Sequence, residues 1–318
     1  MDLTLARLSE IPNLTISRDA PLSAYTRFGI GGPADIYAET ESVEAFIQAL
    51  AVARASGCDY MVMGGGTNLI VSDSGFRGIM LRFAARRILA AGDRVQCDAG
   101  AVLQCLVDFS IDRGLQGLET LAGIPGSVGA AVYGNAGAYG HSISECVRAV
   151  RFFDGVRVRL FDNGECEFHY RESVFKRHKD WIVFSAELRL TPADATVLRQ
   201  RADDIVKVRN EKFPVTMKCA GSIFKNFLLA ELPPAVAAQV PATVVREGKV
   251  PAAYFLEQAG AKGMSRGDIH VACYHANLIY NSGGGTAADL RALIGELTAR
   301  VRRQFAVELE EEVQYVGY

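Results

Sequence analysis

The spacing of apolar residues predicts alternating strands and helices in the first part of the chain. Residues 35–39 and 60–63 are short, mostly apolar runs, which are typical of buried strands. Between them, apolar side chains recur at helical spacing from Val43 to Leu50, and Gly57 follows as a residue that ends helices. The sequence therefore predicts a strand, a helix and a second strand in succession.

The same criteria extend through the middle of the chain. They predict a helix that starts near Val102 and a long polar helix over 194–212. Asp154-Gly155 is a typical hairpin turn. Residues 1–26 show no clear periodicity, and we place them at the periphery. Further strands are predicted at 69–71, 79–81, 147–153, 156–161 and 182–190.

The clearest single element is a helix over 287–305, whose apolar residues lie on one face. Thr286 and Asp289 form a capping-box pattern at its start. A strand is predicted to follow at 307–315. In that strand the apolar residues share one parity, and Glu308, Glu310 and Glu312 share the other. We expect one of these carboxylates to point into a cleft.

Residues 117–140 contain seven glycines and one charged side chain, Glu119. A glycine inside a helix costs about 1 kcal/mol relative to alanine, so we expect a long loop instead of a regular helix. Glycine leaves backbone amides accessible, and such amides bind phosphates. A second glycine loop, Gly64–Asn68, lies between two predicted strands. Together the loops favour one large nucleotide, with a series of tight turns as the alternative.

Composition and charge limit the classes of partner. The 318 residues are 49% hydrophobic and 22% charged, which suits one to three folded domains. A net charge of −2 gives no basic face for nucleic acid. Seven cysteines without a CxxC pair are typical of reduced cytosolic thiols. With no secretory leader and no long apolar run, we expect a cytoplasmic monomer that binds small molecules, without nucleic acid or membrane partners.

Four common signatures are weak or absent. Gly29–Ala34 matches a dinucleotide-binding GxGxxA pattern, but Pro33 leads into a predicted strand where that pattern requires a helix. Neither a P-loop nor a nucleophile-elbow motif occurs. The five histidines show no metal-ligand spacing, so we expect no metal.

Two polar motifs are candidates for chemistry. In Gly221–Asn226, a serine hydroxyl is followed by an ammonium and an amide, a set suited to an anionic ligand. In His169–Ser173, Arg171 offers a guanidinium fork for a carboxylate or phosphate. Turn capping by Ser222 and a surface ion pair of Arg171 are the structural alternatives.

A series of ordered motifs resembles those of the UDP-N-acetylenolpyruvoylglucosamine reductases, flavoproteins that complete UDP-N-acetylmuramate in bacterial cell-wall synthesis. The resemblance extends over nearly the whole chain. Its motifs are Thr26–Gly32, Gly64–Leu69, Leu121–Gly126, Asn135–Gly140, Tyr170–Ser173, Gly221–Asn226, His275–Asn277 and Leu309–Val313.

The resemblance implies an α+β fold with three parts. Two FAD-binding subdomains, of the type shared with vanillyl-alcohol oxidase relatives, would occupy 1–82 and 83–205. A substrate-binding α+β domain would occupy 206–306, and the terminal strand at 307–318 would return to the first subdomain. The short separation of Arg171 and Arg209 leaves no room for an extra tyrosine-bearing loop, so the chain resembles the shorter subtype.

The resemblance also implies which residues hold the ligands. NADPH and the sugar nucleotide both carry phosphates, which suits a set of lysines. The residues implied for non-covalent FAD are Gly64, Gly65, Gly66, Thr67, Asn68, Leu69, Gly123, Ile124, Pro125, Gly126, Ser127, Val128, Asn135, Ala136, Gly137, Ala138, Tyr139 and Arg209. Those implied for the substrate are Lys212, Lys225, Asn226, Lys249, Lys262 and His275.

The implied chemistry has two halves. NADPH reduces FAD by hydride transfer, and the enolpyruvyl sugar nucleotide then takes the hydride at C3. Arg171 and Glu312 match the residues that stabilise the resulting carbanion-like intermediate, and Ser222 matches the one that protonates C2. Glu310 shares the parity of Glu312 and is the alternative.

The chain departs from the family pattern at Phe227, Gln314 and the residues that lead into His275. Two other hypotheses remain open at this point. One is a related flavin oxidase that tethers FAD through a side chain such as His141. The other is a nucleotide-sugar or flavin sensor without turnover.

Overall fold

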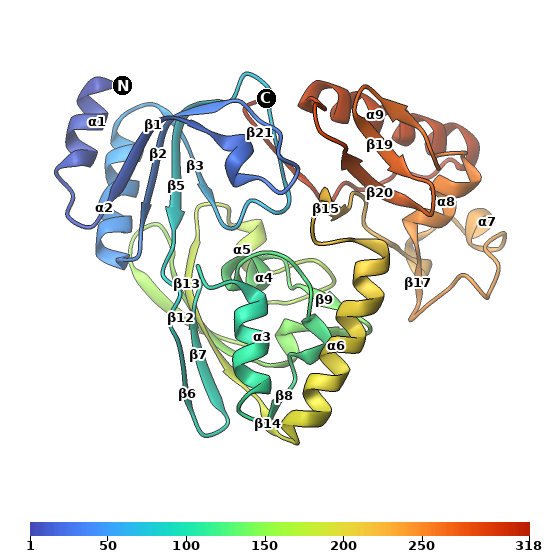
Figure 1. Ribbon diagram of the computed structural model, residues 1–318, viewed down its shortest axis with the longest axis horizontal. Helices are drawn as coiled ribbons and strands as arrows, with labels where there is room; N and C mark the ends of the chain where they lie inside the picture. Colours follow the sequence, from blue (N-terminus) through green and yellow to red (C-terminus); the bar gives the residue numbers. More distant parts are fainter. The chain divides into compact units, whose positions relative to one another are not determined.

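The computed structural model describes residues 1–318 and divides into two compact units. Both units mix helices and strands, as the expected α+β class requires (Figure 1). None of the helices is both long enough and apolar enough to cross a lipid bilayer. Unit 1 comprises Met1–Ala20, Asp35–Gly65 and Gly78–Glu211, and unit 2 comprises Pro21–Ala34, Gly66–Arg77 and Lys212–Tyr318.

The first sheet of the chain has the strand order β1-β2-β5-β3. Its strands are β1 (Thr15–Pro21), β2 (Pro33–Thr40), β3 (Asp59–Met63) and β5 (Phe76–Phe83). Two helices, α1 (Asp2–Ser9) and α2 (Val43–Ala55), pack against each other. The predicted succession of β2, α2 and β3 is confirmed. Residues 1–26, for which we predicted no element, form α1 and β1.

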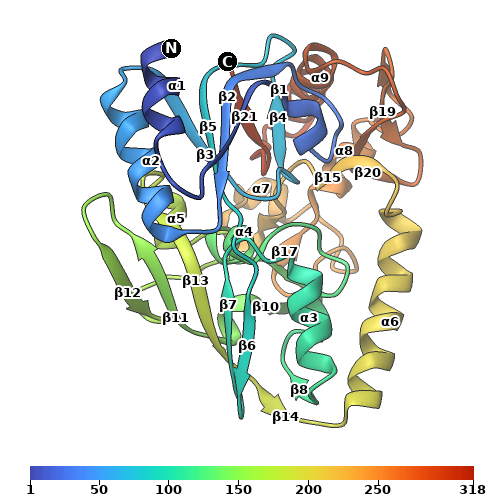
Figure 2. The same cartoon turned by 60° about the vertical axis from the view of Figure 1, so that its left-hand side comes forward.

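The second sheet of unit 1 has the order β12-β11-β13-β7-β6 and is antiparallel throughout (Figure 2). The predicted hairpin forms because the Asp154 carboxylate accepts the N–H groups of Val156 (2.9 Å) and Arg157 (2.8 Å). The strands β6 and β7 were not predicted. The bounds are β6 (Ile88–Ala91), β7 (Arg94–Asp98), β11 (Val147–Phe153), β12 (Val158–Asp162) and β13 (Ile182–Arg189).

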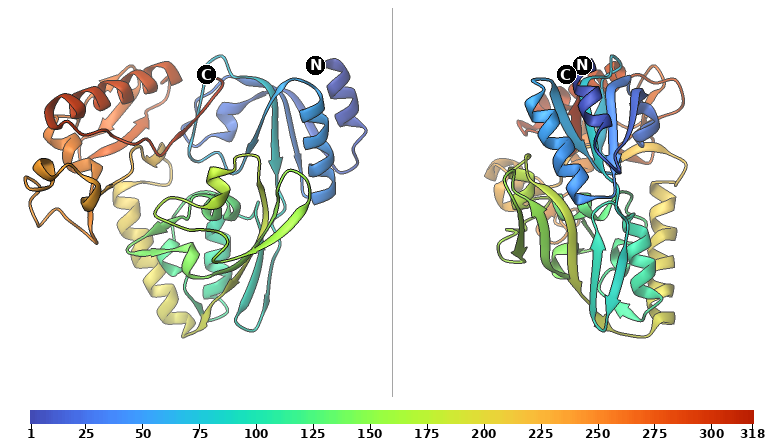
Figure 3. Two further views of the ribbon diagram at one scale, coloured as in Figure 1. Left: turned by 180° about the vertical axis from the view of Figure 1, so that it is seen from behind. Right: turned by 90° about the vertical axis from the view of Figure 1, so that its left-hand side faces the viewer.

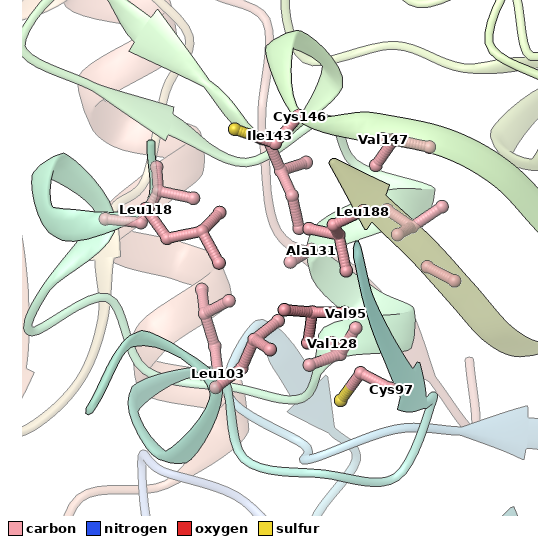
Figure 4. Close-up of a cluster of buried hydrophobic side chains, with 14 of the residues drawn as sticks. Val95, Cys97, Leu103, Leu118, Val128, Ala131, Ile143, Cys146, Val147 and Leu188 are labelled. Carbon is pink, nitrogen blue, oxygen red and sulfur yellow. The ribbon is translucent and has the colours of Figure 1, made fainter. Parts of the chain in front are cut away.

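Helices α3 (Leu103–Ile111), α4 (Val128–Tyr133) and α6 (Ala195–Lys212) contribute apolar residues to the core of this sheet. Leu103 from α3, Val128 from α4 and Leu188 from β13 are all almost completely buried there (Figure 4). The remaining short elements of unit 1 are β8 (Leu115–Gln116), α5 (Val174–Arg177) and β14 (Thr191–Pro192).

The glycine-rich segment 117–140 is more ordered than the expected loop. It contains α4 and a small hairpin of β9 (Gly137–Ala138) and β10 (His141–Ser142). The prediction of an irregular loop was wrong here because neighbours fix the backbone. The Ser127 hydroxyl caps α4 by accepting the Ala130 N–H at 3.3 Å, and a Cβ on Gly129 would come within 2.8 Å of Ala99 Cβ.

Unit 2 is built on a sheet with the order β15-β20-β19-β18. Helix α9 (Ala287–Phe305) packs against β18 and β19, and α8 (Ala252–Gln258) packs against β20 (Figure 3). The four strands are β15 (Lys218–Ser222), β18 (Ser265–Arg266), β19 (Ile269–Ala272) and β20 (His275–Asn281). The smaller elements are β4 (Leu69–Val71), β16 (Phe227–Leu228), α7 (Pro234–Ala237), β17 (Lys249–Val250) and β21 (Gln314–Val316).

The predicted terminal strand over 307–315 is wrong in its extent. Only β21 is a strand, and it pairs in parallel with β4. Residues 310–312 instead make separate hydrogen bonds to residues 223–225. These bonds form one isolated antiparallel bridge, between Phe224 and Glu311, and the residues that follow pair instead with β4.

The start of α9 is fixed from two sides. The Thr286 hydroxyl oxygen accepts the Asp289 N–H at 3.0 Å, as the capping pattern predicts. In addition, the carboxylate of Asp73 accepts the N–H groups of Ala287 (2.8 Å) and Ala288 (2.9 Å). The unpaired amides of this helix end are therefore largely satisfied.

We expect Thr286→Ala to lower the free energy of unfolding by about 1 kcal/mol, because it removes the side-chain cap of α9. Urea unfolding followed by circular dichroism measures this change. Thr243→Ala, at an exposed position of the same unit, is the matched control and should change the free energy little. Equal effects of the two substitutions would contradict a capping role for Thr286.

Candidate active site

Two glycine loops meet in unit 1. A Cβ atom built on Gly65 would lie 3.4 Å from the Cα of Gly126 and 3.5 Å from the backbone nitrogen of Ser127. A Cβ built on Gly64 would lie 3.0 Å from the Ser127 hydroxyl oxygen. The backbones of the two loops are therefore in direct contact, so the segments expected to hold one nucleotide lie side by side.

Arg209, on α6, lies over the second of these loops. A Cβ on Gly123 would come within 3.2 Å of Arg209 Cδ and 3.3 Å of its Nε. The same helix contacts the start of the segment through Arg201, whose guanidinium lies 3.8 Å from the Glu119 carboxylate. Glu119 in turn accepts the Gly117 N–H at 2.8 Å. Glu119, the one charged residue of the segment, thus serves to fold it.

The residues of unit 1 fit a nucleotide cofactor such as FAD. Gly65 and Gly126 bring bare backbone into contact, and the Arg209 guanidinium lies beside Gly123. The Thr120 hydroxyl, in the same segment, is buried without a hydrogen-bond partner. Such burial costs about 1–3 kcal/mol, which a bound acceptor would offset. Backbone amides and a guanidinium are suited to phosphate oxygens.

The remainder of the first loop, from Gly66 to Leu69, belongs to unit 2. The Asn68 side-chain amide donates to the carbonyl of Glu312 at 2.7 Å, and the Gln314 N–H donates to the Asn68 carbonyl at 3.0 Å. Asn68 therefore ties the predicted cofactor loop to the segment that carries Glu312. Residue spacing gave no signal for this link, because 244 positions separate the two residues.

Arg171 occupies the tip of a tight turn in unit 1. His169 and Glu172 exchange two backbone hydrogen bonds, of 3.0 Å and 3.1 Å, so that Tyr170 and Arg171 form the two-residue loop. The φ of Arg171 is +58°, a left-handed conformation that costs a non-glycine residue about 1–2 kcal/mol. Its guanidinium donates to the Gly137 carbonyl at 3.1 Å. The side chain is thus directed towards the β9–β10 hairpin.

Two side chains anchor this turn. The Asn135 amide donates to the His169 carbonyl at 2.8 Å, and the Ser173 hydroxyl donates to the Tyr133 carbonyl at 2.7 Å. Asn135 was predicted to bind the cofactor, yet its side chain connects the glycine-rich segment to the Arg171 turn. Because the Asn135 side chain is used in this way, a contact between Asn135 and the cofactor stays a prediction for its backbone atoms only.

Unit 2 brings Ser222 and Glu312 together. Ser222 ends β15 and pairs with Leu278 of β20. The next carbonyl along, that of Ile223, accepts the Glu312 N–H at 2.8 Å. The two residues predicted to act on the substrate in this unit therefore lie on adjacent, hydrogen-bonded segments.

The two acidic residues before Glu312 have different partners. The Glu310 carboxylate accepts the Lys225 ammonium at 2.5 Å, and the Glu311 carboxylate accepts the Tyr315 hydroxyl at 2.5 Å. The Lys225 side chain is only 10% exposed, whereas that of Glu310 is 68% exposed. Glu310 therefore compensates a buried ammonium, and the choice of Glu312 over Glu310 as the carboxylate that acts on the substrate stays a prediction.

Two predicted substrate residues, Lys212 and Lys262, lie near a third, His275. Burial lowers the pKa of His275; the positive charge of Lys212 lowers it further, the carboxylate of Glu257 opposes this, and Lys262 again lowers it. The Asn277 N–H donates to His275 Nδ1 at 3.3 Å, so a neutral ring carries its proton on Nε2. The cluster thus combines two ammonium groups with a neutral hydrogen-bond donor.

The other two substrate candidates lie beside the Ser222 segment. The Asn226 side-chain oxygen accepts the Ala252 N–H at 3.2 Å, and Lys249 pairs with Leu228 across β16 and β17. Asn277, which the sequence singled out only as part of a motif, exchanges hydrogen bonds of 2.9 Å and 2.8 Å with the backbone of Phe224. It therefore holds the segment that follows Ser222.

The predicted residues are distributed between the two units. Arg171 and Arg209 belong to unit 1, whereas Ser222, Glu312 and all six substrate candidates belong to unit 2. No group of three or more histidine, cysteine, aspartate or glutamate side chains is arranged to hold a metal ion.

The turn geometry predicts an unusual order of stability for variants at position 171. The free energy of unfolding of Arg171→Gly should exceed that of Arg171→Ala by about 1 kcal/mol, because glycine adopts φ +58° without strain. Urea unfolding of both variants measures the difference. At Arg177, on α5, which is not a position of positive φ, glycine should be less stable than alanine. The same order at both positions would exclude backbone strain at Arg171.

The environment of His275 predicts a pH dependence of stability. Since the folded pKa lies below the unfolded value of about 6.5, the unfolded state binds more protons in acid. The native protein should therefore lose stability relative to His275→Gln as pH falls below about 6.5, and the difference should be constant above it. Urea unfolding of both proteins across this range measures the difference. A difference independent of pH would show that the ring is not held neutral.

Comparisons with known proteins place the chain in a family. Residues 34–159 match an FAD binding domain, and residues 213–316 match the C-terminal domain of UDP-N-acetylenolpyruvoylglucosamine reductase. The chain is 69% identical to the UDP-N-acetylenolpyruvoylglucosamine reductase of Solibacter usitatus, over 98% of this chain and 100% of that protein. It is 39% identical to that of Rubrobacter xylanophilus, over 94% of both chains.

A solved structure agrees with this assignment. The crystal structure of the reductase from Thermus caldophilus matches with a TM-score of 0.73 and 28% identity, over 95% of this chain and 98% of that one. The expected fold, an FAD-binding part followed by a C-terminal α+β part, is confirmed. The chain belongs to the UDP-N-acetylenolpyruvoylglucosamine reductase family and carries the FAD-binding domain of a flavin-dependent oxidoreductase.

Proposed function

We propose that the protein reduces UDP-N-acetylglucosamine enolpyruvate to UDP-N-acetylmuramate, with NADPH as reductant, as a cytoplasmic step of peptidoglycan precursor synthesis. Family membership supports the reaction. The observation that carries the proposal is the hydrogen bond from the Glu312 N–H to the Ile223 carbonyl (2.8 Å), because it places the backbone of Glu312 beside the segment that contains Ser222. Glu312 and Ser222 are the residues that the reaction would require from this unit.

We propose that FAD is held without a covalent bond by Gly64–Leu69, Gly123–Val128, Asn135–Tyr139 and Arg209. The contact between Gly65 and Gly126 supports a shared role of the first two segments. FAD, when bound, supplies hydride transfer. We also propose that residues 1–82 and 83–205 form the two cofactor subdomains and that residues 206–306 form the substrate domain. The C-terminal segment 307–318 would return to the first subdomain.

We propose that Lys212, Lys262 and His275 bind an anionic part of the substrate. Two ammonium groups near one neutral imidazole suit a diphosphate or carboxylate, with His275 Nε2–H as a directional donor. The Lys262 ammonium lies 3.1 Å from the Glu257 carboxylate, an ion pair that orients it. Lys225, Asn226 and Lys249, near Ser222, would complete the set.

The protein's own side chains would act on the charge that develops during reduction. The Arg171 guanidinium would stabilise negative charge on the substrate carboxyl group, and Glu312 would hydrogen-bond to the same group. The Ser222 hydroxyl would give its proton to C2 of the substrate. Serine is a weak acid, so this transfer requires a strongly basic carbon and a fixed geometry, which the hydrogen-bonded end of β15 provides.

We expect Ser222→Ala to slow one half-reaction only. NADPH should still bleach the visible flavin band under anaerobic conditions. Reoxidation by the enolpyruvyl sugar nucleotide should be slower by about 10²–10⁴-fold, because the proton donor is missing. Stopped-flow absorbance measures both rates, and Ser265→Ala, an exposed serine of the same unit, is the control.

Each outcome of this experiment has a separate meaning. Wild-type reoxidation in Ser222→Ala would remove the serine from the mechanism. Bleaching without recovery in the wild-type protein would leave a flavoprotein with another substrate. Flavin that stays with the protein through acid precipitation would favour a tethered-flavin oxidase, and the absence of flavin binding would overturn the proposed function.

A further inference from the structure

The Arg171 turn requires support from outside its own backbone. A residue with a side chain at φ +58° is strained, and such a conformation persists only where its surroundings over-determine it. Asn135 holds the start of the turn through the His169 carbonyl, and Ser173 holds the chain after it. Neither contact reaches the peptide group of Arg171.

Lys176 makes that contact. Its ammonium donates to the Arg171 carbonyl at 2.8 Å and to the Glu172 carboxylate at 2.9 Å. The Lys176 side chain is 23% exposed, so water competes only in part for these bonds. A hydrogen bond from an ammonium is stronger than one between neutral groups.

The backbone of Lys176 is itself fixed. Lys176 lies on α5, and its N–H donates to the Ser173 hydroxyl oxygen at 3.3 Å. The same hydroxyl donates to the Tyr133 carbonyl at 2.7 Å, at the end of α4. The ammonium therefore extends from a short helix whose start is tied to the glycine-rich segment.

We propose that Lys176 is a positioning residue for Arg171: by fixing the Arg171 carbonyl, it sets the orientation of the peptide plane and hence the direction of the guanidinium. This role rests on the proposed function, in which Arg171 stabilises the reduced substrate. Arg171 would act in the second half-reaction, in which the substrate reoxidises the flavin. Lys176 acts on the reacting atoms only through Arg171.

The test is Lys176→Met in the full-length FAD-loaded protein, with stopped-flow measurement of both half-reactions. Reduction of the flavin by NADPH should stay within about twofold of wild type. Reoxidation by UDP-N-acetylglucosamine enolpyruvate should slow by about 10- to 100-fold, because a displacement of about 1 Å in a positioned group has effects of this size. Unchanged reoxidation would overturn the proposal.

Two control variants distinguish the positioning role of Lys176 from the effect of its ion pair with Glu172 and from the effect of a lost positive charge. Glu172→Gln removes the ion pair of Lys176 but leaves its bond to the Arg171 carbonyl, and Arg177→Met removes the neighbouring cation, which pairs with Glu167. Both should keep reoxidation within about threefold of wild type. If Glu172→Gln reproduced the effect of Lys176→Met, the ion pair would be the cause and the proposal would fail.

A double-mutant cycle distinguishes failure of this inference from failure of the proposed function. Lys176→Met should have no further effect on reoxidation when Arg171 is already methionine, because the two residues act as one unit. A slow Arg171→Met with a normal Lys176→Met would overturn only the positioning role. A normal Arg171→Met would overturn the proposed role of Arg171 itself. If Lys176→Met does not fold, Lys176→Gln gives the same comparison.

Discussion

Close contact between bare backbones is the constraint on which the candidate cofactor site depends. Gly64 and Gly65 meet Gly126 and Ser127, and Gly123 meets the side chain of Arg209. A Cβ on Gly64 would crowd the Ser127 hydroxyl at 3.0 Å, and Gly123 has a φ of +75°, so glycine is favoured at these two positions. At Gly65 the gap has room for a Cβ, which would lie 3.4 Å from the Cα of Gly126. The surrounding elements serve this contact, since α6 reaches the segment at both Glu119 and Gly123.

Periodicity predicted the regular elements well where one face is apolar. The helices α2 and α9 and the hairpin of β11 and β12 follow from residue spacing and turn chemistry. The strands β6 and β7 and the helix α4 did not follow, because neighbours across the fold stabilise them and their own sequences do not. The Ser127 cap and the approach of Ala99 to Gly129 decide α4, and neither is visible in a local pattern.

The sequence predicts residues for the candidate site but not the contacts that hold them. Motifs singled out Arg171, Ser222 and Glu312, whereas nothing in the sequence shows which side chains bond to their backbones. Asn68 bonds to the Glu312 carbonyl, Lys176 to that of Arg171 and Asn277 to the backbone of Phe224. Such long-range or main-chain contacts leave no periodic signal, since a single amide or ammonium satisfies them.

The pairing of β21 with β4 has a consequence for biosynthesis. Strand β4 lies in the first quarter of the given sequence and β21 at residues 314–316, and the neighbouring Asn68–Glu312 bond spans 244 positions. Contacts that close so long a loop form slowly, and this one cannot form before residues 312–316 have been synthesised. Unit 1 ends at Glu211 and can fold earlier. A nascent chain could therefore fold the glycine-rich segment 117–140 early, while Asn68 lacks its Glu312 partner until the segment around Glu312 is made.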